Sequence, residues 1–102
     1  MKYIKDFVDQ IDEELEGAKE YAETYLELKA KNDSNAMTYA NRYKQMAQEE
    51  LQHANNIHDR AVAEINQLSN VYTPPADMQE KWDLSHKKYV EKAAWIKQML
   101  TL

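Results

Sequence analysis

Residues 32–35 have the sequence NDSN, which consists of turn-forming and helix-capping residue types and contains no apolar side chain. On both sides of this break, the chain is rich in good helix formers and carries apolar residues at helical spacing. The sequence therefore predicts two long helices, at about residues 3–31 and 35–68. Because the break between them is so short, we expect them to fold back on each other as an antiparallel hairpin.

A second break, between residues 69 and 75, ends in two prolines and predicts a third helix over about residues 75–100. The whole chain has one Gly and two Pro in 102 residues, which is typical of an all-α protein. Its length favours a single helical domain that covers residues 1–102.

The composition excludes several classes of function. The formal net charge is −5 and there is no basic cluster, so we expect neither a nucleic-acid partner nor an anionic membrane surface. Cysteine is absent, which rules out thiolate metal sites. The sequence has no apolar run long enough for a membrane span and no apolar signal-peptide core, so it predicts a soluble, cytoplasmic protein.

The first predicted helix has a stripe of mostly apolar residues with alternating steps of three and four. The stripe consists of Ile4, Phe7, Ile11, Glu14, Ala18, Tyr21, Tyr25 and Leu28. Glu14 is its only charged member. The acidic residues Asp6, Glu13, Glu20 and Glu27 fall on the opposite face, where we expect water.

The second predicted helix has a matching stripe. It consists of Ala36, Tyr39, Tyr43, Met46, Glu50, His53 and Ile57. Glu49 falls instead on a face with Arg42 and Asn56 that should be exposed. The alanines at positions 40, 47, 54 and 61 are small and would allow the two helices to approach closely.

Glu14, Glu50 and His53 thus occupy positions where apolar residues are expected. They also lie at similar distances from the turn, so an antiparallel hairpin should bring them to one level. A buried carboxylate is costly unless it is paired or bound to a cation. Glu-x-x-His on one helix, facing a Glu on another, is half of a di-iron carboxylate site. Carboxylate and imidazole donors suit iron or manganese, and would also accept zinc.

Two other interpretations remain open from the residues alone. Glu-x-x-His arises easily by chance in a chain rich in Glu. A buried Glu–His pair can also serve as a polar device that fixes the register of packed helices.

The order of these residues resembles the rubrerythrin and ferritin-like superfamily, and most closely the encapsulated ferritins, over about residues 8–65. The shared pattern is Glu14, the small Gly17, then Tyr21, followed by Glu-x-x-His at residues 50–53. The resemblance implies that Glu14 and Glu50 are carboxylate ligands, with Glu50 bridging, and that His53 is a terminal nitrogen ligand.

The same resemblance implies that Tyr21 lies beside the metal ligands, and that Glu13 and Glu16 form an outer site through which metal ions arrive. The chain departs from encapsulated ferritins in having Glu20 where they have an aromatic residue. Their docking peptide follows the helices, whereas this sequence stops at Leu102, so docking into an encapsulin shell is not expected.

One copy of the chain supplies only half of a four-helix di-iron site. Asp83 and His86 in the third predicted helix have the same three-residue spacing and are candidates for extra ligands. The alternative for His86, and for His58, is a core-edge histidine satisfied by a neighbour. The simpler completion is a homodimer that pairs two hairpins into a ferritin-like four-helix bundle with two metal ions.

The sequence therefore predicts a di-metal protein, with two iron ions per dimer, that acts as a ferroxidase or in peroxide-linked redox chemistry. Glu14, Glu50 and His53 would be its catalytic ligands. The alternative is a non-catalytic helical assembly module, of the kind that phages encode, which keeps the fold and has lost the chemistry.

Overall fold

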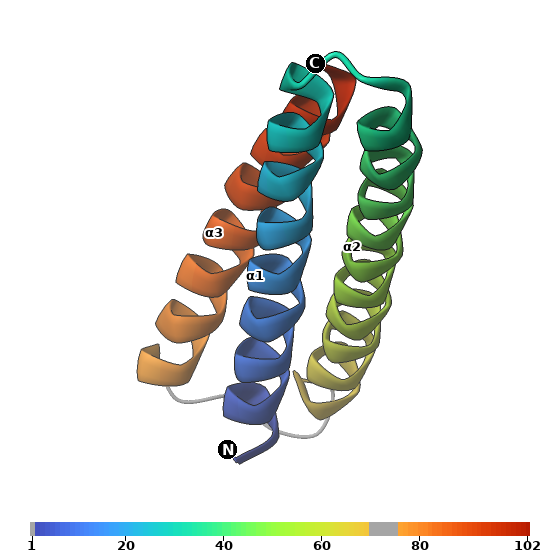
Figure 1. Ribbon diagram of the computed structural model, residues 1–102. Helices are drawn as coiled ribbons and strands as arrows, with labels where there is room; N and C mark the ends of the chain where they lie inside the picture. The colour runs from blue at the N-terminus through green and yellow to red at the C-terminus, as the bar shows by residue number, and fades with distance from the viewer. Residues whose placement is uncertain (1, 70–75) are drawn as a thin grey trace.

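Three helices make up the computed structural model, which describes residues 2–69 and 76–102 (Figure 1). They are α1 (Lys2–Ala30), α2 (Ser34–Ser69) and α3 (Ala76–Thr101), and the described residues contain no strand. Each helix begins and ends within one residue of its predicted range, although Pro75 lies outside the described residues. The all-helical prediction is confirmed. None of the three helices has an apolar run long enough to cross a lipid bilayer.

The turn between α1 and α2 is built by the residues that predicted it. Asn32 has a φ of 51°, in the left-handed region that Asn tolerates better than most residues, and its N–H donates to the carbonyl of Lys29. Asp33 then caps α2, because its carboxylate accepts a hydrogen bond of 3.1 Å from the N–H of Asn35. These two caps end one helix and start the next within a few residues, which forces the antiparallel hairpin.

Small residues form the contact between α1 and α2. Ala18 and Ala22 of α1 are fully buried. So are the four alanines at positions 40, 47, 54 and 61 of α2, as their size predicts. Leu15 and Ile11 fill the space beside them and are 1% exposed. The hairpin is therefore held together by close backbone approach and by a thin line of aliphatic side chains.

Helix α1 is the central element, because it packs against both other helices, whereas α2 and α3 meet chiefly through side chains. The fully buried Ile96 anchors α3 to the core. Among the described residues, hydrogen bonds between Tyr89 and Asn55 and between His86 and His58 link α3 to α2. The molecule is correspondingly slender, at 57 × 18 × 17 Å.

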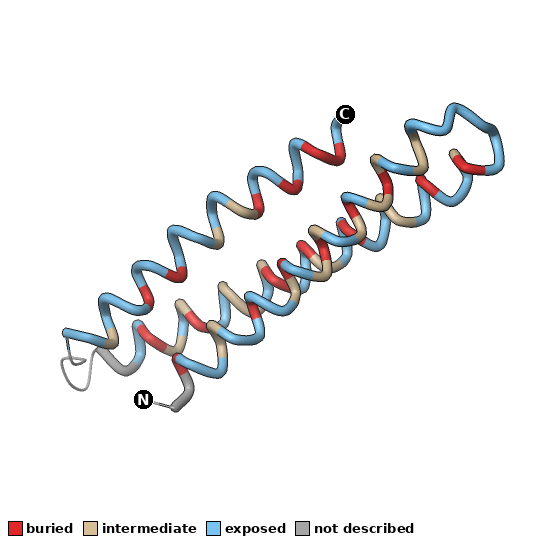
Figure 2. Tube along the Cα trace, turned by 60° about the vertical axis from the view of Figure 1, so that its left-hand side comes forward, coloured by how far each residue is buried: buried red, intermediate tan, exposed pale blue. Residues whose placement is uncertain are grey.

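Part of the α2 stripe is open to solvent in the single chain, whose burial along each helix is drawn in Figure 2. Tyr39 is 53% exposed, Met46 is 37% exposed and the His53 side chain is 59% exposed. The alanine line faces α1 instead, because small side chains allow the closest approach. Helix α3 lies on the other side of the hairpin and cannot cover this stripe. The predicted exposure of Arg42 and Glu49, by contrast, is confirmed.

Candidate metal centre

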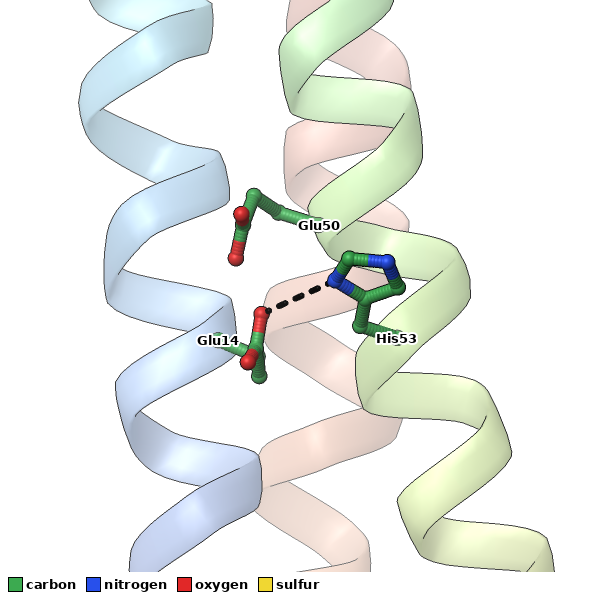
Figure 3. Close-up of side chains that lie close together, drawn as sticks. All are labelled: Glu14, Glu50 and His53. Atoms are coloured by element: carbon green, nitrogen blue, oxygen red, sulfur yellow. Dashed lines mark ion pairs between the residues drawn. The ribbon is translucent and has the colours of Figure 1, made fainter.

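Glu14 projects from α1 toward Glu50 and His53, which project from neighbouring turns of α2 (Figure 3). Each of the three offers a ligand atom that lies within 4.8 Å of the other two. Helix α3 passes behind the hairpin in this view, so the cluster lies on the face of the hairpin away from α3. The equal heights expected from the hairpin register are therefore observed for these three side chains.

The Glu14 carboxylate is incompletely satisfied. Its Oε2 atom is buried and accepts no hydrogen bond from the described residues. Nδ1 of His53 lies 3.6 Å from this oxygen, too far for a hydrogen bond. A buried carboxylate oxygen without a partner destabilises the fold by about 1–3 kcal/mol. This atom therefore marks a position where a bound cation would supply the missing interaction.

The pKa of the Glu50 carboxyl is raised above its ordinary value. The first cause is the Glu14 carboxylate, to which a protonated Glu50 can donate a hydrogen bond. Burial and repulsion from the Glu14 charge raise the pKa of Glu50 further, while His53 acts in the opposite direction. Two carboxyl groups that compete for one proton are a common arrangement where a divalent cation replaces that proton.

Gly17 lies beneath the Glu50 carboxylate. It follows Glu14 by three residues, so both face α2. A Cβ at position 17 would lie 3.6 Å from Oε2 of Glu50, which is ordinary van der Waals contact. Alanine would therefore fit, but a longer side chain would push the Glu50 carboxylate out of its place. The chain keeps its one glycine at this point of the hairpin.

Tyr21 lies on the same face as Glu14, two helical turns further along α1. It is half-buried, and its ring packs against that of Tyr43 at a centroid distance of 6.0 Å. Among the described residues, its hydroxyl makes no hydrogen bond to Glu14, Glu50 or His53. The contact that the structure shows for Tyr21 is thus an aromatic pair with Tyr43 rather than a hydrogen bond to a ligand.

Glu13 and Glu16 do not join the cluster. Glu13 is exposed on the outer side of α1. Glu16 accepts a hydrogen bond of 2.8 Å from Lys92 of α3, and this ion pair lowers the pKa of Glu16. Both line a shallow groove between α1 and α3. The outer site expected from the resemblance would therefore have to compete with Lys92.

Asp83 and His86 are also remote from the three ligands, because α3 is on the other side of the hairpin. Nδ1 of His86 lies 2.8 Å from Nε2 of His58, whose ring stacks on Tyr89 at 4.6 Å. Asp83 accepts a hydrogen bond from Gln79. The interpretation of His86 and His58 as histidines satisfied by a neighbour fits these contacts, and each is the neighbour of the other.

The cluster belongs to a half-exposed face of the hairpin. Phe7, Tyr21 and Leu28 of α1 are half-buried there, and Tyr39 and Met46 of α2 are exposed. These apolar side chains form a band above and below the two carboxylates, which we call the hairpin face. The sequence identified its members as the stripes of the two helices, but periodicity does not say which side of the hairpin a third helix will cover.

Comparison with known proteins adds no family assignment: none of the protein-family models, curated proteins or solved structures matches this chain. The chemical argument therefore rests on the geometry of the cluster and of the hairpin face.

Proposed function

We propose that this protein binds divalent transition-metal ions between two copies of the chain and uses them to handle iron. The single observation that carries the proposal is the buried Oε2 of Glu14, which accepts no hydrogen bond from the described residues and on which Glu50 and His53 converge. An unpartnered buried oxygen is rare in folded proteins and calls for an explanation. A cation bound at this point would explain it.

The donor set favours particular metals. Two carboxylates and one imidazole provide hard and intermediate ligands and no thiolate. Iron(II), manganese(II) and zinc(II) all accept this set, and it is the set found in half of a four-helix di-iron site. We therefore propose iron as the metal in use, with manganese or zinc as possible replacements.

A second copy of the chain is part of the proposal. Three protein ligands from one chain leave metal coordination incomplete, and a two-fold axis beside the cluster would add the same three from the partner. The hairpin face supplies the apolar surface for such contact, because Tyr39 and Met46 are exposed in the single chain. A four-helix bundle with two metal ions between the hairpins would bury the side chains of Tyr39 and Met46.

The residues have separate tasks in this scheme. Glu14 would hold a metal ion with an oxygen that accepts no hydrogen bond from the described residues. Glu50 adds a second carboxylate ligand, and Gly17 leaves room for it. His53 binds through a ring nitrogen and brings no charge. When bound, iron would supply redox chemistry with oxygen or peroxide as the oxidant.

The test is iron oxidation by the purified protein, followed by the absorbance of Fe(III). Glu14→Ala and His53→Ala should abolish the activity and retain the helical circular-dichroism signal. Glu13→Ala and Glu49→Ala are matched controls, because each removes an exposed carboxylate next to a ligand. Full activity in both ligand variants would refute the proposal.

A second candidate is a non-catalytic helical assembly module. The observation in its favour is that protonated Glu50 can satisfy Glu14, so the cluster can persist without a metal. Elemental analysis of protein purified without chelators separates the two functions. The di-metal function requires about two ions per dimer, whereas less than about one favours the assembly module.

A further inference from the structure

A groove of about 490 Å³ runs between α2 and α3, away from the metal centre. Its lining includes Lys44, Leu51 and Asn55 of α2, and Tyr89, Lys97 and Leu100 of α3. The groove exists because α3 packs on α1 and leaves α2 at a distance that side chains only partly bridge. Its volume falls within the range of roughly 300–1,000 Å³ that is typical of small-molecule sites.

The hydrogen bonds between the helices fix the register of the groove. Tyr89 is hydrogen-bonded to Asn55, and His86 to His58. The two helices are therefore antiparallel here, and a step of three residues forward along α3 matches a step of three residues back along α2. Continued by the same steps, this register places Ala93 opposite Leu51. Lys44 comes level with Leu100, and Lys97 lies about one helical turn away from that level.

The two ends of the groove therefore differ in chemistry. Both lysines lie at the end near the α1–α2 turn, and the lining contains no carboxylate, although the chain as a whole has a net charge of −5. Neither lysine forms an ion pair with any described residue. Lys44 Nζ lies 5.7 Å above the ring of Tyr25, which holds the ammonium near the groove without neutralising it.

At the other end no charged residue lines the groove, although the Asp59 carboxylate is near enough to raise the pKa of Tyr89 slightly. The Tyr89 hydroxyl donates a 3.0 Å hydrogen bond to Asn55 Oδ1 and so joins the two walls. Burial raises the pKa of Tyr89, so this donor keeps its proton at neutral pH. The floor is formed by Leu100 at the lysine end and by Leu51 and Ala93 further along, all of which belong to the hydrophobic core. Gln48 and Gln52 of α2 also line this stretch.

We propose that this groove binds a single-chain amphipathic carboxylate, such as a medium-chain fatty acid. The carboxylate lies between Lys44 and Lys97, and the alkyl chain follows the apolar floor toward Tyr89. The length from the lysines to Asn55 is about 12–16 Å at 1.5 Å per residue, which suits an extended chain of this class. A helix, about 10–12 Å across, is too wide for a groove of this volume.

Decanoate is a suitable probe because it is soluble well below the concentration at which it forms micelles. We expect saturable binding to the full-length protein in a nuclear magnetic resonance titration. The methyl signals of Leu51 and Leu100 should shift and show nuclear Overhauser effects to the decanoate chain. Decyltrimethylammonium, which has the same chain with a cationic head, should not bind in the groove.

The double variant Lys44→Gln/Lys97→Gln should weaken decanoate binding at least roughly tenfold, the size expected for the loss of charge-assisted hydrogen bonds. Lys81→Gln/Lys88→Gln is the matched control, because it removes two charges from a groove between α1 and α3 instead. Glu14→Ala should bind decanoate normally, so failure of the metal proposal leaves this one standing.

Three results would overturn the proposal. The first is equal decanoate affinity in the wild type and in the double lysine variant. The second is equal binding of decanoate and decyltrimethylammonium, which would show unspecific adsorption of the alkyl chain. The third is a set of decanoate contacts at Tyr39 and Met46 on the hairpin face, with none at Leu51 or Leu100.

Discussion

Nδ1 of His53 on α2 and Oε2 of Glu14 on α1 are 3.6 Å apart, although 39 positions of sequence separate the two residues. Two ligands of one transition metal, each at about 2.0–2.2 Å from the ion, are roughly 3–3.5 Å apart. The pair is therefore spaced slightly too widely for a hydrogen bond and nearly right for shared coordination. A small rotation of the exposed His53 ring would complete the geometry.

Metal binding and dimerisation should depend on each other. Met46→Lys places a charge on the hairpin face, one helical turn from Glu50, where the wild-type side chain is already partly exposed in the single chain. The variant should fold, remain monomeric and lose metal, as measured by native mass spectrometry and elemental analysis. Leu84→Lys, on the exposed side of α3, is the control and should keep both properties. A metal-loaded monomer would contradict the prediction.

Removal of the unpartnered carboxylate should stabilise the metal-free protein. Glu14→Leu deletes a buried oxygen that has no hydrogen bond, so the free energy of unfolding should rise by about 1 kcal/mol in urea titrations with chelator present. The same change should abolish metal binding. Glu14→Gln keeps the shape and serves as the comparison. A loss of stability in Glu14→Leu would mean that the carboxylate has a partner in solution.

The pH dependence of stability should report on Glu50. Its pKa is raised in the folded state, so its contribution to stability is complete below the unfolded value of 4.5 and is lost as the pH rises through the folded value. Glu50→Gln keeps a neutral side chain at every pH. The variant should therefore match the metal-free wild type in acid and exceed its stability increasingly toward about pH 7. Urea unfolding at several pH values measures this difference, and a constant difference across the range would exclude the raised pKa.

The packing of helix α3 against the core should depend on one buried side chain. Ile96 is 0% exposed, and Ile96→Ala should lower the free energy of unfolding by about 2–5 kcal/mol. Val90 lies on the outer surface of the same helix and is 51% exposed, so Val90→Ala should change stability by less than about 0.5 kcal/mol. Chemical denaturation compares the two. Similar effects would mean that α3 is not docked as described.

A four-helix di-metal site is built from four helices, and in the proposed dimer each hairpin would supply two of them. The third helix stands outside that arrangement. It covers the side of α1 away from the cluster, holds Glu16 through Lys92, and forms the groove with α2. In the proposed dimer, both α3 helices would therefore lie on the outside, and their grooves would remain accessible.

Sequence by itself determined the three helices, the hairpin and the convergence of Glu14, Glu50 and His53. These features depend on local physics: capping residues at the turn, helical periodicity, and equal distances along two antiparallel helices. Glu49 and Glu50 illustrate this, since adjacent residues point to different sides of a helix and only the second faces α1. The same reasoning identified Glu13 as a solvent-facing residue.

Only the tertiary structure decided which side of the hairpin α3 covers. That choice left Tyr39 and Met46 exposed, paired Glu16 with Lys92, and joined His58 to His86. A helical stripe specifies the face that is apolar, but the partner for that face is selected by the packing of all three helices together. The Glu14 cluster thus follows from the sequence, whereas its open position on the hairpin face follows from where α3 docks.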